Sequence, residues 1–166
     1  MFDHEMREVA ERALRACRQR KLRIVTAESC TGGLIAATLT AIAGSSDVVD
    51  RAFITYSNDA KREMLGVPWD AILGYGAVSD PVARAMAAGA LSRSSADIAV
   101  SVTGVAGPGG GTAEKPVGLV HFGAASRGGG LIHRERRFGD IGRAEVRRLS
   151  VLEALAMLTE LASGAK

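Results

Sequence analysis

The chain has 166 residues, of which 47% are hydrophobic and 23% charged, and this composition indicates a folded globular protein rather than a disordered one. Its net charge of +3 is too small and too dispersed to indicate a nucleic-acid partner. Its two cysteines exclude a disulfide framework, and no apolar run approaches the ~18 residues of a membrane span. We therefore expect a cytoplasmic protein with a single domain over residues 1–166.

The first part of the chain predicts helices alternating with strands. Apolar residues at helical spacing predict an amphipathic helix over residues 4–20, with Cys17 on its apolar face. A strand is predicted over residues 21–27. A second helix over residues 34–43 is expected to end at Gly44 as its C-cap.

The middle of the chain continues this alternation. A strand over residues 51–57 leads into a short helix over residues 60–65, for which Asn58 or Asp59 is the expected cap. The chain is then predicted to turn around residues 74–76, where two glycines flank a tyrosine.

The last part of the chain adds a hairpin and two helices. A helix over residues 80–93 is expected to begin with Asp80 as N-cap and Pro81 at its first position. The later predicted elements are the strands 97–102, 117–125 and 131–138, a hairpin connection at 127–130 and a closing helix over 143–162. Because helices separate the earlier strands and a hairpin joins the last two, we expect an α/β fold. It is a three-layer α/β/α sandwich with a mixed, mostly parallel sheet of about five strands.

Three loops follow the carboxyl ends of predicted strands, the edge at which ligands bind in open α/β sheets. In the first loop, Ser29 stands at a strand-to-helix turn, and the amides of Thr31, Gly32 and Gly33 are expected to point outward unpaired. Such a turn can hold a phosphate or stabilise the oxyanion of an acyl-transfer reaction beside a serine nucleophile. The alternative is that Ser29 or Thr31 merely caps the helix.

The second loop contains a base that can activate a serine. Tyr56 lies at a strand end, and Lys61 lies in the first turns of the following helix. No histidine is well placed as a base, because His121 and His133 fall within strands and His4 is near the N-terminus. Serine–lysine pairs replace histidine when the pKa of the lysine is lowered by burial or by nearby positive charge. The alternative is an ordinary surface lysine.

The third loop is rich in glycine and includes Thr103, Gly104 and Gly107. It lacks the Gly-Lys-Ser/Thr of a phosphate-binding loop, and no helix follows it as in a dinucleotide-binding motif. It either lets backbone approach a ligand or is a flexible crossover. No set of residues in the sequence has the spacing of a metal site, so no metal and no cofactor is expected.

Four segments resemble the family of the C-terminal domain of the competence/damage-inducible protein CinA. They are residues 27–33 (AESCTGG), 56–61 (YSNDAK), 76–79 (GAVS) and 103–118 (TGVAGPGGGTAEKPVG). The resemblance covers nearly the whole chain, with the four segments in the family's order and spacing. It implies the three-layer sandwich described above.

The resemblance also implies an activity, because stand-alone members of this family are nicotinamide-nucleotide amidases. It implies hydrolysis of the carboxamide of nicotinamide mononucleotide to nicotinic acid mononucleotide and ammonia. The family's catalytic serine and lysine match Ser29 and Lys61, and its assisting tyrosine matches Tyr56. The expected partners are this small nucleotide and further copies of the chain, without nucleic acid or membrane.

The chain departs from the family pattern before its last helix. Members usually carry Phe-x-Gly-Asp-Arg there, whereas residues 138–143 read FGDIGR, one residue longer, with Arg143 as the candidate substrate-binding arginine. Some members also carry a nucleotide pyrophosphatase domain, for which 166 residues leave no room. Two other readings stay open: a non-catalytic pyridine-nucleotide-binding domain of the same fold, and an enzyme with Cys30 as nucleophile.

Overall fold

A mixed five-stranded sheet forms the middle layer of the fold. The computed structural model describes residues 2–164, and its strands lie in the order β2-β1-β3-β4-β5. The strands are β1 (Ile24–Glu28), β2 (Val49–Ile54), β3 (Ile98–Gly104), β4 (Leu119–Ser126) and β5 (Gly130–Arg137). β1 is parallel to β2 and β3, and β4 is antiparallel to β3 and β5. Only β4 therefore runs against the other four strands, which confirms a mixed, mostly parallel sheet.

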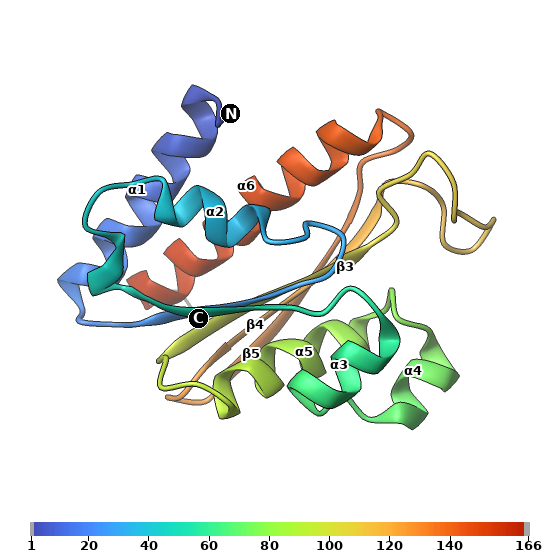
Figure 1. Ribbon diagram of the computed structural model, residues 1–166, viewed down its shortest axis with the longest axis horizontal. Helices are drawn as coiled ribbons and strands as arrows, with labels where there is room; N and C mark the ends of the chain where they lie inside the picture. The colour runs from blue at the N-terminus through green and yellow to red at the C-terminus, as the bar shows by residue number, and fades with distance from the viewer. Residues whose placement is uncertain (1, 165–166) are drawn as a thin grey trace.

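Helices cover both faces of this sheet (Figure 1). They are α1 (His4–Gln19), α2 (Leu34–Thr40), α3 (Asn58–Leu65), α4 (Trp69–Tyr75), α5 (Asp80–Ser92) and α6 (Arg143–Ser163), with a short 3-10 helix at Ser45–Asp47. α1, α2 and α6 lie on one face, and α3, α4 and α5 lie on the other. The predicted three-layer α/β/α sandwich is confirmed.

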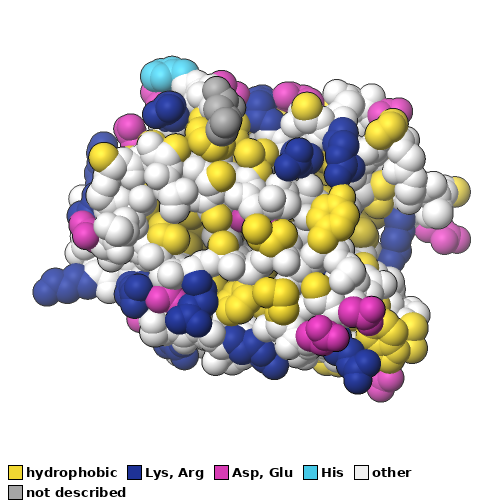
Figure 2. Space-filling model, in the orientation of Figure 1, with side chains coloured by type: hydrophobic (Ala, Val, Ile, Leu, Met, Phe, Trp, Pro, Cys, Tyr) yellow, Lys and Arg dark blue, Asp and Glu magenta, His cyan; other side chains and the backbone are white. Residues whose placement is uncertain are grey.

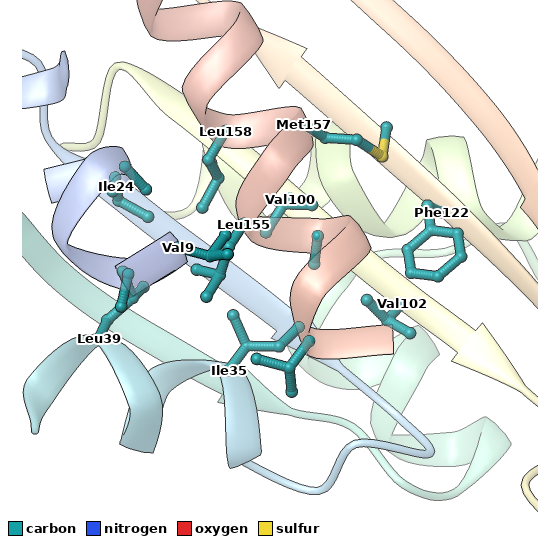
Figure 3. Close-up of a cluster of buried hydrophobic side chains, with 14 of the residues drawn as sticks. Val9, Ile24, Ile35, Leu39, Val100, Val102, Phe122, Leu155, Met157 and Leu158 are labelled. Carbon is teal, nitrogen blue, oxygen red and sulfur yellow. The ribbon is translucent and has the colours of Figure 1, made fainter. Parts of the chain in front are cut away.

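Each face of the sheet packs against its helices through a separate apolar core. On the α1, α2 and α6 side, buried Leu39 and Leu155 belong to the same apolar cluster as Val100 and Phe122 of the sheet (Figure 3). This core excludes water from the interface between the helices and strands β1 and β3. Burying one leucine or phenylalanine side chain there contributes about 2 kcal/mol to the stability of the fold. The helices are therefore fixed over the strands whose ends carry the candidate site.

Two helices begin one residue away from the predicted caps. The hydroxyl of Ser57 accepts from the amide of Ala60 at 3.0 Å, so Ser57 caps α3 and the prediction of Asn58 or Asp59 is wrong. Asp80 is likewise the first residue of α5 rather than its cap, and its carboxylate accepts from Arg84.

Two further local predictions are wrong. Helix α2 ends at Thr40 with Ala41 as its C-cap, whereas Gly44, with φ of 78°, is the N-cap of the 3-10 helix. Helix α4 was predicted only as a turn around residues 74–76. The described chain therefore has six α-helices, where five were predicted.

The surface carries mixed charge. On the face shown in Figure 2, Lys and Arg side chains are interspersed with Asp and Glu side chains and with small apolar areas. No helix in residues 2–164 has the length and apolar character needed to cross a membrane.

Candidate active site

Ser29 lies at the edge of the sheet where β1, β2 and β3 end. Glu28, the last residue of β1, pairs with Ile54 of β2 on one side and Val102 of β3 on the other. The amide of Ser29 then donates to the carbonyl oxygen of Val102 at 3.0 Å. Because neighbouring strands lie about 4.8 Å apart, the loops that follow these strands start side by side.

Lys61 contacts Ser29 directly. Its Nζ lies 2.9 Å from Oγ of Ser29, 2.9 Å from the carbonyl oxygen of Thr55 and 3.2 Å from that of Tyr56. Lys61 is only 1% exposed, so an ammonium group there would be largely desolvated. Burial lowers the pKa of Lys61 from 10.5 to about 8.

The two carbonyl oxygens orient the lone pair of a neutral Lys61. A neutral amine has two N–H groups and one lone pair. When the N–H groups donate to the carbonyl oxygens of Thr55 and Tyr56, the lone pair is left facing the hydroxyl of Ser29. This is the arrangement that a lysine needs in order to take a proton from serine.

The histidines within the strands do not compete for this role. His121 and His133 bind each other, with Nδ1 of the first 2.8 Å from Nε2 of the second. Their other ring nitrogens face the carboxylates of Glu135 and Asp80 at 3.7 and 3.6 Å. Neither is bonded to Ser29 in the described chain, so Lys61 is the base in contact with the serine.

The side chain of Glu28 occupies the N-terminus of α2. Its carboxylate accepts from the amides of Gly33, Ile35 and Ala36 at 2.9 to 3.1 Å and from the hydroxyl of Thr26 at 3.2 Å. Glu28 is fully buried, and these four hydrogen bonds offset the desolvation of its charge. The protein's own carboxylate therefore already complements the positive end of this helix.

The expectation of three successive unpaired amides at this turn is wrong for two of them. The amide of Gly33 donates to the carboxylate just described, and that of Gly32 donates to the carbonyl oxygen of Ser29 at 3.0 Å. In the part of the chain that the structure describes, the amides of Cys30 and Thr31 have no oxygen acceptor. These two adjacent amides next to Ser29 are therefore the candidate donors to an oxyanion.

Tyr56 and Arg143 form a bridge across the loops. The hydroxyl of Tyr56, which is 60% exposed, accepts from Nη2 of Arg143 at 2.8 Å. Nη1 of Arg143 donates to the carbonyl oxygen of Gly107 at 3.0 Å. Within residues 2–164 the Tyr56 hydroxyl makes no hydrogen bond to Ser29 or Lys61, and the backbone carbonyl oxygen of Tyr56 is what accepts from Lys61.

Thr103 and Gly104 are held by internal contacts. The hydroxyl of Thr103, which is buried, donates to the carbonyl oxygen of Ala77 at 2.8 Å. A Cβ at Gly104 would lie 2.9 Å from the carbonyl oxygen of Leu119, so the pairing of β3 with β4 is enough to require glycine there. Both residues are therefore explained by the packing of the fold.

Cys30 is a poor nucleophile in this environment. It is 5% exposed, and burial raises the pKa of its thiol to about 12. The thiol is therefore protonated at neutral pH, whereas the thiolate is the reactive form. Cys17 is also buried, as its place on the apolar face of the first helix predicts. In residues 2–164, no three His, Cys, Asp or Glu side chains are grouped so as to hold a metal ion.

Sequence reasoning missed two residues at this site, Glu28 and Arg147. Nη2 of Arg147 donates to the carbonyl oxygen of Thr31 at 3.0 Å. A signal existed for Arg147, because it lies four residues after Arg143 and so on the same face of α6. For Glu28, the signal was an acidic residue shortly before a helix N-terminus.

Comparisons with known proteins identify the family of this chain. The profile of the CinA C-terminal domain matches residues 6–162. The chain belongs to the CinA C-terminal domain family. The resemblance that its sequence segments indicate is thereby confirmed.

Members of this family include curated proteins and solved structures that align with nearly the whole chain. The nicotinamide-nucleotide amidohydrolase PncC of Escherichia coli K12 is 48% identical over 159 residues, which are 95% of each chain. The competence/damage inducible protein of Agrobacterium tumefaciens is 56% identical and superposes with a TM-score of 0.95, covering 97% of this chain and 98% of that one. A CinA superfamily protein of Klebsiella pneumoniae is 36% identical with a TM-score of 0.90, covering 96% and 98%.

Proposed function

We propose that this chain is an amidohydrolase that converts nicotinamide mononucleotide to nicotinic acid mononucleotide and ammonia through a Ser29–Lys61 pair. The observation that carries the proposal is the 2.9 Å contact between a buried lysine amine and a serine hydroxyl at the ligand-binding edge of the sheet. The substrate follows from the relative of Escherichia coli, whose name states that it acts on nicotinamide nucleotide.

In the first half of the reaction, Oγ of Ser29 attacks the carboxamide carbon and neutral Lys61 takes the hydroxyl proton. The carbonyl oxygen of the substrate becomes an oxyanion, for which the amides of Cys30 and Thr31 are the donors in this proposal, because they have no oxygen acceptor in the described chain. The intermediate then collapses with cleavage of the C–N bond. The Lys61 ammonium returns its proton to the leaving amide nitrogen, so ammonia departs and an ester on Ser29 remains.

In the second half, water hydrolyses this ester. Neutral Lys61 takes a proton from the water as its oxygen attacks the ester carbon. The same two amides hold the second oxyanion, and cleavage of the C–O bond returns the proton from Lys61 to Oγ of Ser29. The net change is consumption of one water and release of one carboxylic acid and one ammonia.

The rim of the site supports recognition of a phosphorylated substrate by Arg143. The N-terminus of α2 is filled by Glu28, which leaves that helix end unsuited to a phosphate. Among residues 2–164, Arg143 instead donates its hydrogen bonds to neutral oxygen atoms, those of Tyr56 and Gly107. A guanidinium group with neutral partners can turn to form paired hydrogen bonds to a phosphate.

Ammonia release from nicotinamide mononucleotide by the purified chain tests this function. The wild-type chain should turn over, and Ser29→Ala should lose at least about a thousandfold in kcat, because the nucleophile is gone. Cys30→Ser is the matched control on the adjacent residue and should retain most of the activity. If the wild-type chain binds the nucleotide but releases no ammonia, it is a pyridine-nucleotide-binding domain of the same fold. If only Cys30→Ser loses activity, the cysteine is the nucleophile.

A further inference from the structure

Arg147 is an arginine of α6 without an acidic partner. Its neighbour Arg148 pairs with Asp3, Glu5 and Glu145, as surface arginines commonly do. Among residues 2–164, no carboxylate lies within 4.0 Å of Arg147, and its Nε is buried without a hydrogen-bond acceptor. The side chain as a whole is half-buried, but a buried N–H group without an acceptor costs free energy, so the position of Arg147 calls for a functional reason.

The unpaired polar atoms of the described chain gather around the candidate site. Besides Nε of Arg147, the buried side-chain atoms without a partner are Oγ1 of Thr31 and Oγ1 of Thr55. Thr31 follows the nucleophile by two residues, and the carbonyl oxygen of Thr55 accepts from Lys61. Unsatisfied buried groups that cluster in this way are typical of functional sites rather than of ordinary packing.

Arg147 holds one peptide unit of the turn that carries the nucleophile. Nη2 of Arg147 donates to the carbonyl oxygen of Thr31, which also accepts from the amide of Leu34 at 3.1 Å. The amide of the same peptide unit belongs to Gly32 and donates to the carbonyl oxygen of Ser29. This peptide unit is thus fixed at both its oxygen and its nitrogen. The preceding amides, which have no oxygen acceptor in the described chain, are thereby held in one orientation.

We infer that Arg147 is a positioning residue for catalysis, which fixes the Ser29–Gly33 turn so that its two available amides meet the oxyanion. The inference rests on the proposed amidohydrolase function. The permanent positive charge of Arg147, which no carboxylate within 4.0 Å compensates in residues 2–164, also favours the anionic intermediate over the neutral substrate. Arg147 does not touch the substrate in this scheme: it acts through the backbone of Thr31 and Gly32 and through the field of its charge.

Arg147→Met separates this role from a purely structural one. The variant should lose about a hundredfold in kcat, as enzymes do when an oxyanion donor is removed, while KM changes by less than about threefold. Its Tm should be unchanged or higher, because the carbonyl oxygen of Thr31 keeps the amide of Leu34 and the buried Nε without an acceptor is gone. Arg147→Lys, which keeps the charge without the planar fork, should regain about tenfold of the lost kcat. Arg148→Met, one residue along the same helix, should keep wild-type kcat.

Three results would overturn the inference. The first is an Arg147→Met variant with wild-type kcat. The second is an Arg147→Met variant in which kcat and Tm both fall, with both values restored in Arg147→Lys. The third is an Arg147→Met variant that does not fold. The Ser29→Ala variant distinguishes failure of the inference about Arg147 from failure of the proposed function. An active Ser29→Ala variant refutes the amidohydrolase mechanism itself. An inactive Ser29→Ala beside a fully active Arg147→Met refutes only the role of Arg147.

Discussion

Acidification should switch off the reaction through protonation of Lys61. Only the neutral amine can take the proton of Ser29, and the pKa of Lys61 is lowered to about 8 by burial. About a tenth of the lysine is then neutral at pH 7 and about a hundredth at pH 6. We expect kcat/KM to rise about tenfold per pH unit from pH 6 to 7.5 and to level off above about pH 8.5.

The same shift in pKa sets a stability cost that a second measurement can test. A fall from 10.5 to about 8 corresponds to about 3 kcal/mol, since each pKa unit is worth about 1.4 kcal/mol. The unfolded chain keeps the proton up to about pH 10.5, so between pH 8 and 10.5 it binds more protons than the folded chain, and stability rises with pH. Below pH 8 the full cost is present. Lys61→Met should therefore raise the unfolding free energy at pH 7 by up to about 3 kcal/mol, less the lost hydrogen bonds.

Ammonia release across pH 6 to 9, with urea unfolding at pH 7, measures both effects on the same preparations. Lys61→Met should lose at least about a thousandfold in kcat. Lys61→Arg is the charge-matched control and should be equally inactive, because a guanidinium stays protonated. Near-normal turnover of Lys61→Arg would show that the positive charge matters and that the residue is not a base. A wild-type profile that is flat between pH 6 and 8 would refute the titration of this lysine.

The remaining predictions concern the substrate's phosphate, metal dependence and the cap of α2. Wild type should prefer nicotinamide mononucleotide over its riboside by at least about a hundredfold in kcat/KM. In Arg143→Ala the ratio of the two kcat/KM values should be smaller, which assays of both substrates on both proteins measure. Equal efficiency of wild type on both would mean that the phosphate is not recognised. Dialysis against EDTA should leave turnover unchanged, since no suitable group of metal ligands occurs in residues 2–164, and loss that added zinc or magnesium reverses would contradict this. Glu28→Ala should lower the unfolding free energy in urea by about 2–4 kcal/mol, because three amides of α2 lose their acceptor, and an unchanged midpoint would contradict the cap.

The fold could be predicted from local patterns because most elements carry strong ones. The first helix has apolar residues on one face, and all of them are buried as predicted. The first three strands lie between helices and are parallel, whereas the Gly-rich connection at 127–130 joins an antiparallel pair. Helix α4 was missed because it is only seven residues long, has a single buried residue, Ile72, and contains Gly74.

Local sequence patterns predicted the residues of the candidate site that follow strands, but not the contacts that depend on how distant segments pack. Ser29 and Lys61 each follow a strand, so parallel pairing was enough to bring them together. The contact between Arg147 and Thr31 joins residues 116 apart and depends on how α6 crosses the sheet, which no local pattern encodes. The role of Glu28 depends on the chain folding back, so that a side chain of β1 reaches the start of α2.

The placement of Glu28 is consistent with the proposed role of Lys61 as a base. A carboxylate facing Lys61 would favour the ammonium form and raise the pKa of the amine, which would remove the base. Glu28 directly precedes Ser29, yet its carboxylate is turned to the amides of α2 and saturated by four hydrogen bonds. In the described chain no carboxylate lies within 4.0 Å of Nζ of Lys61, and burial is the main influence on its pKa. One acidic side chain therefore stabilises the helix that follows the nucleophile and, by its engagement there, leaves the neighbouring lysine free to be neutral.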